Sequence, residues 1–463
     1  MLNHFNFQEF HGAYLLTNDL GRYAFVSKAQ LRDLISGSLD PDSPVGQKLQ
    51  EQFFLFQGSV PGLLQRETHF MRDSKNYLFE PTTLHIFVVT NECNANCVYC
   101  QANNGFTKLS DRMDPAVGER AVDIALSSPA PALSFEFQGG EPLLNFDVIR
   151  HIIEYAEKKN TGKEIYYSLV SNLTLLTDDM LEFFQKHRVN ISTSLDGPQF
   201  LHDHNRPYKS GAGTYQDLRR AVNRVRKAGL KLGAIETTTR FSLPHAKEIV
   251  DIYAEWGFHS LFLRPLTPLG CAQKQWNEIG YTPEEFTAFY QEAIHYILEK
   301  NLQGYRMQEG HAATFFSKIL HGYSVNYMEL RSPCGASLGQ MAYYTNGDVF
   351  TCDEGRMLYE MGKDAFRLGN VWENTYSQLV HSSTCRAVCL ASITESIPGC
   401  CDCVYQPYCG VCPVVNVALY GDLLPKSPQN YRCGLYRGML NVLFSLLQQE
   451  EPMTMKLLES WYA

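Results

Sequence analysis

Between residues 82 and 264, six apolar strand-like runs alternate with five amphipathic helical patterns. The strand-like runs lie at 83–90, 132–138, 164–170, 190–195, 231–238 and 258–264. The helical patterns lie between them, at 115–127, 146–159, 177–187, 213–228 and 244–256. Strands that alternate with helices of this length are typical of parallel βα units, so an α/β fold is predicted. Six consecutive units favour a partial (βα)6 TIM barrel, and an open doubly wound sheet is the alternative.

Length and composition describe a globular protein with ample material for a core. The chain has 463 residues, of which 44% are hydrophobic and 19% are charged, and its net charge is −9. This acidic balance argues against a nucleic-acid partner and against attachment to an anionic membrane through bulk charge. No apolar run reaches the roughly 18 residues of a membrane span. The first residues lack a basic segment followed by an apolar one, so we expect a cytoplasmic protein.

Residues 1–80 precede the alternating region and are expected to form a small α+β domain. Residues 14–26 have the pattern of a β-hairpin, and helices are expected near 28–37 and 43–53. This order of strands and helices fits a winged-helix-like fold. Such a domain either caps the domain that follows or receives a peptide by strand addition to an exposed edge.

The chain contains 14 cysteines, and their distribution divides the remainder of the sequence. None precedes Cys93, three lie between Cys93 and Cys100, and ten lie between Cys334 and Cys433. In a reducing cytosol, so many thiols are more typical of metal or cluster ligands than of disulfides. The domains predicted are therefore 1–80, a barrel at 81–310, and a cysteine-rich domain at 311–463 with a helix near 434–449.

The first strand-like run of the barrel ends in a loop that carries Cys93, Cys97 and Cys100, with the spacing Cys-x3-Cys-x2-Cys. Three thiolates on one short loop can hold three corners of a [4Fe–4S] cluster and leave the fourth iron open. Structural zinc normally has four closed ligands, and no fourth ligand lies nearby in the sequence. The spacing therefore favours an iron–sulfur site over zinc and over three incidental thiols.

A second motif, Gly139-Gly140-Glu141-Pro142, follows the next strand-like run. Two glycines allow the backbone to approach a ligand closely, and Glu141 could pair with an ammonium group. Alone, the segment predicts only a turn. Because it follows the strand next to the three-cysteine loop, it supports a ligand site at the carboxyl ends of the strands.

With an aromatic residue, Tyr99, before its last cysteine, the loop resembles the signature of the radical S-adenosylmethionine (SAM) enzymes. The resemblance implies that Cys93, Cys97 and Cys100 ligate a [4Fe–4S] cluster whose open iron binds SAM. It also implies that an electron from the cluster cleaves SAM to methionine and a 5′-deoxyadenosyl radical, which abstracts hydrogen from a substrate. Tyr99 would lie against the adenine.

The resemblance assigns further residues to the cofactor. The residues so assigned are Gly139, Gly140, Glu141, Pro142, Ser171, Asn172, Ser194, Asp196, Arg206 and Arg264. The Gly-Gly-Glu-Pro segment would line the methionyl amine, and the serine, asparagine and aspartate segments would contact the ribose and carboxylate. Arg206 and the preceding His202 resemble a helix-start segment of peptide-modifying members. Ordinary turn chemistry is the alternative for the serine segments. Arg264 is a candidate for the carboxylate of either the cofactor or the substrate, and a surface salt bridge is its alternative.

Residues 334–433 resemble the seven-cysteine SPASM extension of radical SAM enzymes that modify peptides and proteins. The positions that match are Cys334, Gly347, Cys352, Cys400, Cys403, Cys409, Cys412 and Cys433. The chain departs from the pattern in one place, because two residues separate Cys409 from Cys412 where the family usually has three.

This resemblance implies two auxiliary iron–sulfur clusters, expected as [4Fe–4S]. The first set of ligands is Cys400, Cys403, Cys409 and Cys433, and the second is Cys334, Cys352 and Cys412, nearer the active site. A fourth ligand of the second cluster is unassigned, and Cys385, Cys389 and Cys401 are thiols in range. Cys271 is expected to be structural. Two zinc sites are the physical alternative, since paired Cys-x2-Cys units also suit zinc.

The expected function is modification of a peptide or small protein by a deoxyadenosyl radical. Over its length the chain resembles the maturases of His-Xaa-Ser peptide systems. This resemblance implies a low-potential electron donor of flavodoxin or ferredoxin type, and a second maturase as a further possible partner. Asp353 resembles the proton-accepting aspartate of anaerobic sulfatase-maturating relatives, and a turn residue is its alternative. Crosslinking, oxidation of Ser or Cys, and epimerisation are the competing reactions. A non-catalytic electron relay is the non-enzyme alternative.

Overall fold

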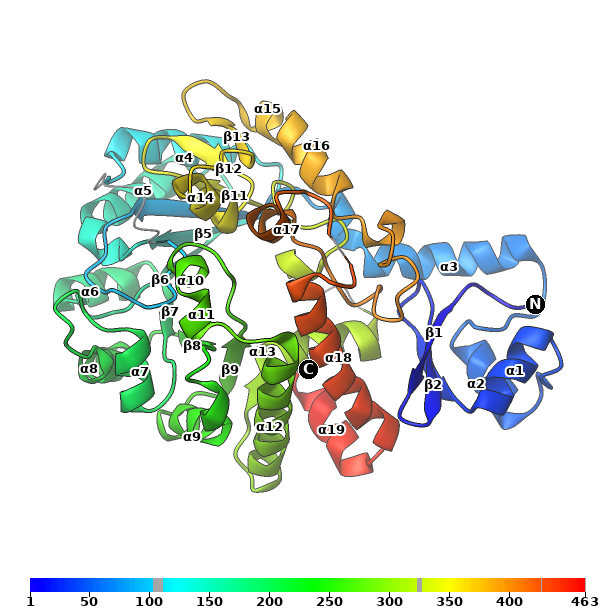
Figure 1. The fold of residues 1–463 in the computed structure, drawn as a ribbon. Coiled ribbons are helices and arrows are strands. Elements are labelled where there is room, and N and C mark those ends of the chain that lie inside the picture. The colour runs from blue at the N-terminus through cyan, green and yellow to red at the C-terminus, as the bar shows by residue number, and fades with distance from the viewer. Residues whose placement is uncertain (103–110, 323–326, 426, 463) are drawn as a thin grey trace.

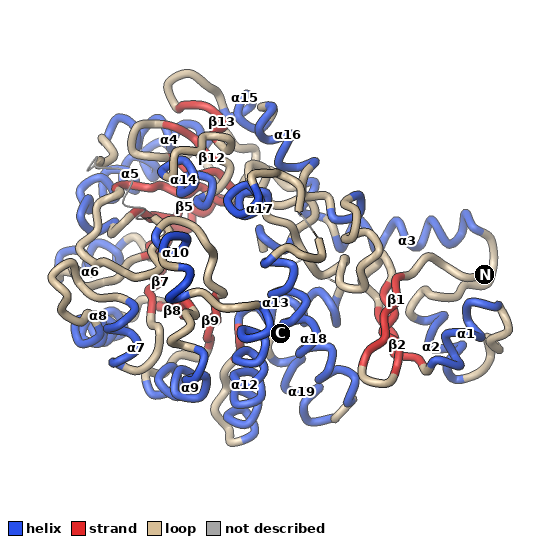
Figure 2. Tube along the Cα trace, viewed as in Figure 1, coloured by secondary structure: helices blue, strands red, loops and turns tan. Residues whose placement is uncertain are grey.

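The computed structural model describes residues 1–102, 111–322, 327–425 and 427–462. Six consecutive parallel strands of a ten-stranded sheet form a curved inner wall (Figures 1 and 2). These strands are β4 (Leu84–Thr90), β5 (Ala132–Gly139), β6 (Glu164–Val170), β7 (Asn190–Ser194), β8 (Leu232–Thr237) and β9 (Ser260–Arg264). They coincide closely with the six predicted runs. The strand order is β10-β9-β8-β7-β6-β5-β4-β11-β12-β13, so the sheet stays open and the predicted partial barrel is confirmed.

Helices cover the outer side of this wall (Figure 1). They are α4 (Pro115–Leu126), α5 (Phe146–Lys159), α6 (Asp178–Lys186), α7 (Gln199–Asn205), α8 (Tyr215–Lys227) and α9 (Ala246–Glu255). Side chains alternate along β5, where Phe135 and Phe137 are buried in the same core as Ile149 and Ile152 of α5. Glu136, between the two phenylalanines, therefore faces the inside of the barrel. Along β5 the apolar face thus meets the helices, and the inner face is left for polar groups.

The cysteine-rich C-terminal part is joined to the barrel through the sheet itself. β11 (Gln340–Tyr343) pairs in parallel with β4, and β12 (Asp348–Phe350) and β13 (Arg367–Asn370) continue the sheet in antiparallel order. At the opposite edge, β10 (Gln308–Glu309) pairs with β9. The division predicted near residue 310 is therefore not a break in the sheet. The helices of this part are α12 (Pro283–Leu302), α13 (Gly310–Phe316), α14 (Asp353–Glu360), α15 (Tyr376–Val380), α16 (Ser383–Leu390), α17 (Pro413–Tyr420), α18 (Tyr431–Gln449) and α19 (Pro452–Ser460). Two four-residue helices, α10 (Cys271–Lys274) and α11 (Trp276–Ile279), precede α12.

The N-terminal residues form a separate three-stranded antiparallel sheet with three helices (Figure 1). The elements are β1 (Asn6–Phe10), β2 (Ala13–Thr17), β3 (Tyr23–Val26), α1 (Lys28–Ser36), α2 (Pro44–Glu51) and α3 (Val60–Ser74). The sequence predicted the β2–β3 hairpin and the first two helices. It missed β1, which alternates poorly, and α3, which has Pro and Gly in its first turn. Hydrogen bonds from Asn6 to Cys401 O (3.0 Å) and from Thr17 to Val404 O (2.7 Å) fix this sheet to the cysteine-rich part.

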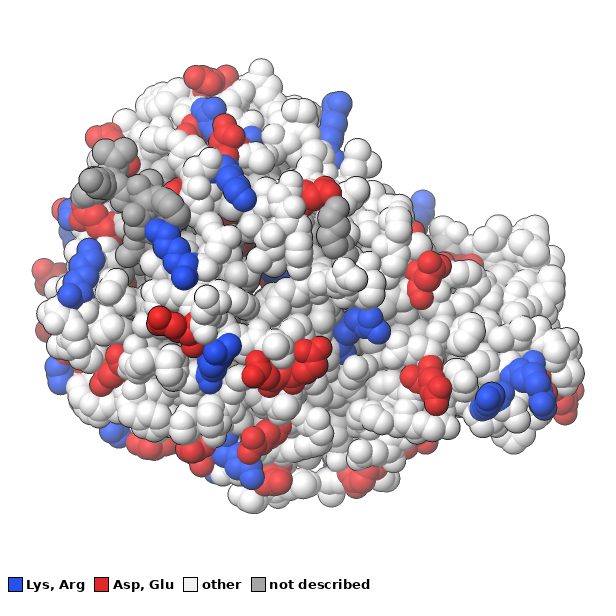
Figure 3. All heavy atoms as spheres, in the orientation of Figure 1, with Lys and Arg blue, Asp and Glu red and all other residues white. Residues whose placement is uncertain are grey.

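The surface carries charges of both signs. On the face drawn in Figure 3, basic and acidic residues are interspersed. Among the residues that the structure describes, no helix is both long and apolar enough to cross a membrane.

Truncation of a fully buried side chain between α5 and the sheet tests the barrel core. We expect Ile152→Ala to lower the free energy of unfolding by about 2–5 kcal/mol, because it removes transfer energy and leaves a cavity. Glu154→Ala, at an exposed position of the same helix, should change it by no more than about 0.5 kcal/mol. Urea denaturation of both variants checks this, and equal effects of the two would contradict the packing described.

Candidate functional site

The three-cysteine loop lies at the carboxyl end of β4 and is held by the segment that follows α7. The amide of Asn96 donates to Pro207 O (2.8 Å), and that of Val98 donates to Asn205 O (2.9 Å). Burial raises the pKa of Cys97 to about 12 and that of Cys93 to about 11. These thiols are therefore protonated near neutral pH, and each must lose its proton to bind a metal.

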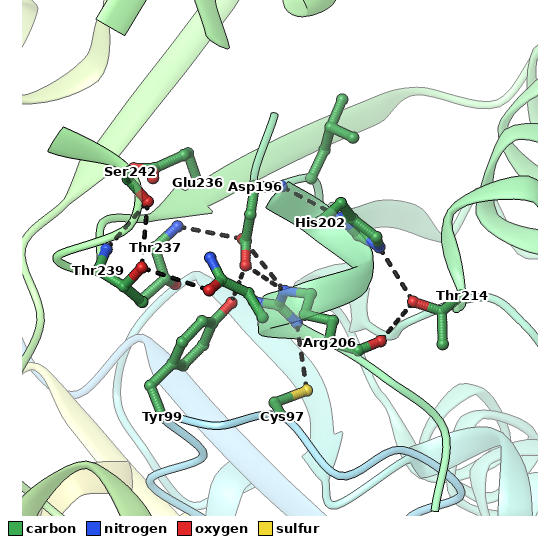
Figure 4. A network of polar contacts seen from close by, with 12 residues as sticks. Cys97, Tyr99, Asp196, His202, Arg206, Thr214, Glu236, Thr237, Thr239 and Ser242 are labelled. Carbon is green, nitrogen blue, oxygen red and sulfur yellow. Dashed lines mark hydrogen bonds and ion pairs between the residues drawn. The ribbon is translucent and has the colours of Figure 1, made fainter. Parts of the chain in front are cut away.

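The carboxylate of Asp196, just beyond β7, joins the loop to the barrel (Figure 4). Asp196 is fully buried and accepts a hydrogen bond of 2.5 Å from the Tyr99 hydroxyl. Arg206 Nε lies 3.1 Å from both carboxylate oxygens, and its guanidinium lies over the Tyr99 ring at 5.0 Å. Thr237 at the end of β8 donates its backbone amide to the same carboxylate (3.3 Å). Three residues predicted from the sequence, Tyr99, Asp196 and Arg206, thus form one network.

Arg206 also links this network to the cysteines. Its Nη1 lies 4.0 Å from Cys97 Sγ. Burial alone would lower the pKa of Arg206, but the Asp196 carboxylate outweighs burial and holds that pKa well above its ordinary value. A permanent positive charge therefore faces the cysteine loop, where it would favour a thiolate or an anionic cluster.

His202 supports Arg206 through a chain of hydrogen bonds. Burial lowers the pKa of His202 to about 4, so its imidazole is neutral near pH 7. Its Nδ1 accepts from the Asp196 amide (3.3 Å), which leaves Nε2 to donate to Thr214 Oγ1 (3.1 Å). The Thr214 hydroxyl in turn donates to Arg206 O (2.6 Å). His202 is therefore a positioning residue.

The Gly139-Gly140 pair lies against the backbone of the cysteine loop. A Cβ on Gly139 would lie 2.3 Å from Thr90 O, and one on Gly140 would lie 2.2 Å from Glu92 O. The amide of Gly140 donates to Thr90 O (2.9 Å). The glycines thus allow β5 to approach the end of β4 and the residues that follow it. Their close approach to a ligand stays a prediction.

Glu141 is the buried carboxylate of this loop. It is 1% exposed and accepts hydrogen bonds from Ser171 Oγ (2.7 Å), Asn172 N (2.8 Å) and Leu143 N (3.1 Å). Burial raises the pKa of Glu141 to about 7, although these hydrogen bonds act in the opposite direction. Ser171 and Asn172, assigned to the cofactor by resemblance, therefore also orient Glu141. Pro142 starts a short 3-10 turn, Pro142–Asn145.

A small cavity lies beside the cysteine loop and collects several of the predicted residues. Its lining consists of Ala95, Cys97, Asn172, Ser194, His202, Arg206, Thr214 and Leu218. Residues from the ends of β4, β6 and β7 meet here, as expected for parallel strands. Sequence analysis named Cys97, Asn172, Ser194 and Arg206 for this site, and the structure brings all four together.

Arg264 lies apart from this cavity, in a charged cluster between β9 and the C-terminal part. Its Nη2 is 3.2 Å from Glu354 and 3.7 Å from Glu329, which also contacts Arg432. Burial would raise the pKa of Glu329, but Arg432 and Arg264 outweigh burial and lower it. The predicted alternative for Arg264, a salt bridge, is thus present, although it is partly buried. Glu329, Glu354 and Arg432 gave no sequence signal, because the contacts join distant segments.

Asp353 lies in a second buried ion pair near the same inner surface. Arg356 donates to its carboxylate through Nε (3.1 Å) and Nη2 (2.5 Å), and through Nη1 to Glu360 (3.1 Å). Glu136 of β5 faces this group from the barrel interior, where Ser168 and Gln138 donate to it. Burial raises the pKa of Glu136, and the charge of Asp353 adds to that effect. Sequence analysis missed Glu136, whose only signal is a carboxylate within an apolar strand.

The C-terminal cysteines separate into two groups in space. Cys400, Cys403 and Cys433 are close enough to Cys409 that their charges add to burial in raising its pKa. In the same way, burial raises the pKa of Cys352, and the charges of Glu354, Cys412 and Cys334 raise it further. Cys334 and Cys352 share one buried cluster, against which Cys412 packs. These are the two sets that the resemblance implied.

The donor sets fit iron–sulfur clusters. Among the described residues, no three His, Cys, Asp or Glu side chains converge closely enough to hold a single metal ion. Cysteine thiolates are the ordinary ligands of iron–sulfur clusters. The cysteine loop supplies three such thiols beside a cavity and a fixed arginine. The groups therefore fit a cluster with one open iron.

Comparisons with known proteins agree with this geometry. The model of the radical SAM superfamily matches residues 87–250. The uncharacterized protein MJ0907 of Methanocaldococcus jannaschii is 31% identical over 219 residues, which are 47% of this chain and 74% of that protein. The cysteine-type anaerobic sulfatase-maturating enzyme of Clostridium perfringens is 27% identical over 313 residues, 65% of this chain and 81% of that enzyme.

Two solved structures share the fold. Native anSMEcpe with bound AdoMet has a TM-score of 0.69 at 24% identity and covers 80% of this chain and 98% of its own. Streptococcus suis SuiB bound to S-adenosylmethionine has a TM-score of 0.55 at 14% identity and covers 93% of this chain and 98% of its own. The chain belongs to the radical SAM superfamily. Its three-cysteine loop matches the cluster and SAM chemistry of that superfamily, and its cysteine-rich C-terminal part is consistent with auxiliary clusters.

The buried carboxyl of Glu141 predicts a pH dependence of stability. Its pKa rises from 4.5 to about 7 on folding, so its contribution is complete below about pH 4.5 and is lost as the pH rises through about 7. Between about pH 5 and about pH 8, the free energy of unfolding of the cluster-free protein should fall by about 2–3 kcal/mol more in wild type than in Glu141→Gln. Urea denaturation at both pH values measures this. Parallel pH profiles of the two proteins would contradict it.

Proposed function

We propose that this chain is a radical SAM maturase that modifies a peptide or a small protein. The observation that carries the proposal is the position of the three-cysteine loop at the carboxyl ends of the strands. The loop lies beside the small cavity, near Glu141, and contacts with Tyr99, Asp196 and Arg206 hold it there. When bound, a reduced [4Fe–4S] cluster and SAM supply a 5′-deoxyadenosyl radical that abstracts hydrogen from the substrate.

The roles of the chain's own residues follow from their chemistry. Cys93, Cys97 and Cys100 hold the cluster and leave one iron open. Glu141 in its ionised form pairs with the methionyl ammonium, with the Gly139–Pro142 segment around it. Asn172 and Ser194, in the lining of the cavity, contact the ribose and carboxylate of SAM. The Arg264 cluster, farther along the barrel, holds a substrate carboxylate.

The auxiliary cysteines extend this proposal to electron transfer. Cys400, Cys403, Cys409 and Cys433 hold one cluster, and Cys334, Cys352 and Cys412 hold another. Oxidation of a substrate radical releases an electron, and these clusters accept it. A low-potential flavodoxin or ferredoxin supplies the electron that starts the reaction.

The part of this chain that the anSMEcpe fold does not cover supports a peptide substrate. The anSMEcpe match uses nearly all of that protein but leaves a fifth of this chain uncovered, whereas the SuiB match extends to 93% of this chain. SuiB is also solved with its precursor peptide, SuiA. We assign the additional N-terminal sheet and helices to peptide recognition.

The edge strand β1 is suited to that role. It pairs with β2 alone, and a groove runs beside Gln8–His11 between α12 and α18. His11 and Gly12 both have positive φ, as in a two-residue type I′ hairpin. In that register Phe10 exchanges hydrogen bonds with Ala13, so the backbone groups of Glu9 point away from β2. They are available to an added strand.

A proline at position 9 tests this edge. Glu9→Pro removes the outward amide of β1 without breaking the β1–β2 ladder, since proline is tolerated on edge strands. A fluorescein-labelled peptide with three His-Ala-Ser repeats should bind Glu9→Pro about tenfold more weakly than wild type, by loss of a backbone hydrogen bond. Glu9→Ala should bind within about twofold of wild type. Fluorescence anisotropy gives the affinities, and equal weakening by both variants would argue against strand addition.

A His-Xaa-Ser repeat peptide is the substrate we propose, on the resemblance of the whole chain to those maturases. Sulfatase-type oxidation of Ser or Cys is the second candidate, favoured by the Clostridium perfringens relative and by Asp353. Arg356 holds the Asp353 carboxylate in a buried ion pair, which fixes its position at the inner surface. The reaction catalysed on a repeat peptide therefore decides between the two.

Formation of 5′-deoxyadenosine tests the enzyme proposal. We expect the anaerobically reconstituted protein, given dithionite and SAM, to release 5′-deoxyadenosine, and Cys100→Ala to lower the rate at least about a hundredfold, because one cluster ligand is lost. Mass spectrometry quantifies the product. A protein that binds SAM with full iron loading but never consumes it, with or without the repeat peptide, would be an electron relay. A colourless protein without iron would support the zinc alternative.

A further inference from the structure

The auxiliary cluster at Cys334, Cys352 and Cys412 has three assigned ligands, and four thiols of the chain belong to no assigned set. They are Cys271, Cys385, Cys389 and Cys401. A [4Fe–4S] cluster with three protein ligands keeps an iron open to a substrate, whereas one with four serves electron transfer alone. The position of these thiols therefore bears on the role of the cluster.

Two of the four thiols lie at other sites. The amide of Cys271 donates to Cys100 O (2.9 Å), which places it beside the first cysteine loop. Cys401 lies between Cys400 and Cys403, and its carbonyl accepts from Asn6 (3.0 Å) on the side of the N-terminal sheet. These contacts tie Cys271 to the first cysteine loop and Cys401 to the group of Cys400. The remaining two lie one turn apart on α16.

The last turn of α16 is tied to the backbone of Cys334. The amide of Cys334 donates to Ser392 Oγ (3.0 Å), and this hydroxyl donates to Val388 O (2.7 Å). The Val388 side chain is buried in the same cluster as Cys334 and Cys352. The Ser392 hydroxyl also lies 3.2 Å from Cys389 O, so the backbone of Cys389 belongs to the turn that contacts Cys334, and the Cys389 side chain packs against the neighbouring core cluster.

The charges around Cys389 agree with this placement. The pKa of the Cys389 thiol is raised by its hydrogen bond with Cys385, by burial, and further by the charges of Cys385 and Cys334. Arg331, which is 2% exposed, has its guanidinium 4.3 Å from the Tyr77 ring centre and interacts with both Cys334 and Cys389. A buried positive charge that acts on both thiols stabilises an anionic iron–sulfur cluster. The pKa of Cys385 is lowered instead by its contact with Cys389 and further by Ser337, His381 and Arg386, against the effect of burial.

We propose that Cys389 is the fourth ligand of the auxiliary cluster held by Cys334, Cys352 and Cys412. The inference rests on the proposed function, since it requires that cluster. Each of the four thiols gives up its proton to solvent as it binds iron. With four protein ligands the cluster has no iron for a substrate thiolate, so its role is to accept electrons. A substrate is then held by other parts of the barrel.

Controlled oxidation of the cluster tests the assignment without any substrate. Substitution of Cys93, Cys97 and Cys100 by alanine first removes the cluster that has an open iron. In the reconstituted background protein, brief ferricyanide treatment should leave little [3Fe–4S] signal in electron paramagnetic resonance, because each iron has a cysteine. Adding Cys389→Ala should raise that signal roughly tenfold, because an iron without a cysteine ligand is released. Cys385→Ala, one turn earlier on α16, should match the background.

Each outcome has a defined meaning. A strong [3Fe–4S] signal in the background, no increase with Cys389→Ala, or an equal increase with Cys385→Ala would overturn the assignment. If Cys389→Ala does not fold, Cys389→Ser retains the side-chain volume. The serine variant should change the spectrum of one reduced cluster, and an unchanged spectrum would overturn the assignment as well. Iron and sulfide contents distinguish failure of the broader proposal, since a background protein that assembles no cluster contradicts the auxiliary clusters themselves.

Discussion

The buried carboxylate of Asp196 is the interaction on which the candidate site depends. It receives hydrogen bonds from Tyr99 on the cysteine loop, Arg206 after α7 and the backbone of Thr237 after β8. Loss of one partner from a buried ion pair of this kind costs about 3–5 kcal/mol, because a charge is left uncompensated. The position of the cysteine loop is thus tied to the integrity of three strand ends.

The interior of the barrel has the polarity that a reaction chamber needs. Apolar side chains of the strands face the helices, and Glu136 and Arg264 face inward with Asp353 and Glu354 opposite them. Arg264, Asp353 and Glu354 each take part in an ion pair, and Glu136 accepts hydrogen bonds from Ser168 and Gln138. This arrangement also explains why the predicted cofactor residue Arg264 lies away from the cysteine loop. It belongs to the half of the interior where the C-terminal part meets the barrel.

The periodicity of the sequence was sufficient to predict the barrel, because each strand and helix has its own local pattern. Tyr99, Asp196 and Arg206 were named from motifs, but the contact of Tyr99 with Asp196 joins residues 97 apart in the chain and has no local signal. Glu136 was missed for a related reason, since a single carboxylate in an apolar strand does not show which face it occupies. The pairing of β11 with β4 was equally hidden, because the four residues Gln340–Tyr343 are too short for a clear strand pattern. Sequence patterns identified the elements, and contacts between distant segments made the site.

The parallel pairing of β11 with β4 has a consequence for electron movement. The loop with Cys93 continues from β4, and Cys352 follows β12, which is the neighbour of β11 in the same sheet. The distance between the two cysteine groups is therefore set by backbone hydrogen bonds and not by a flexible linker. In the proposed function, an electron that passes between these groups would cross a path whose length the sheet fixes. The sheet that builds the barrel would then also act as a rigid spacer between the proposed clusters.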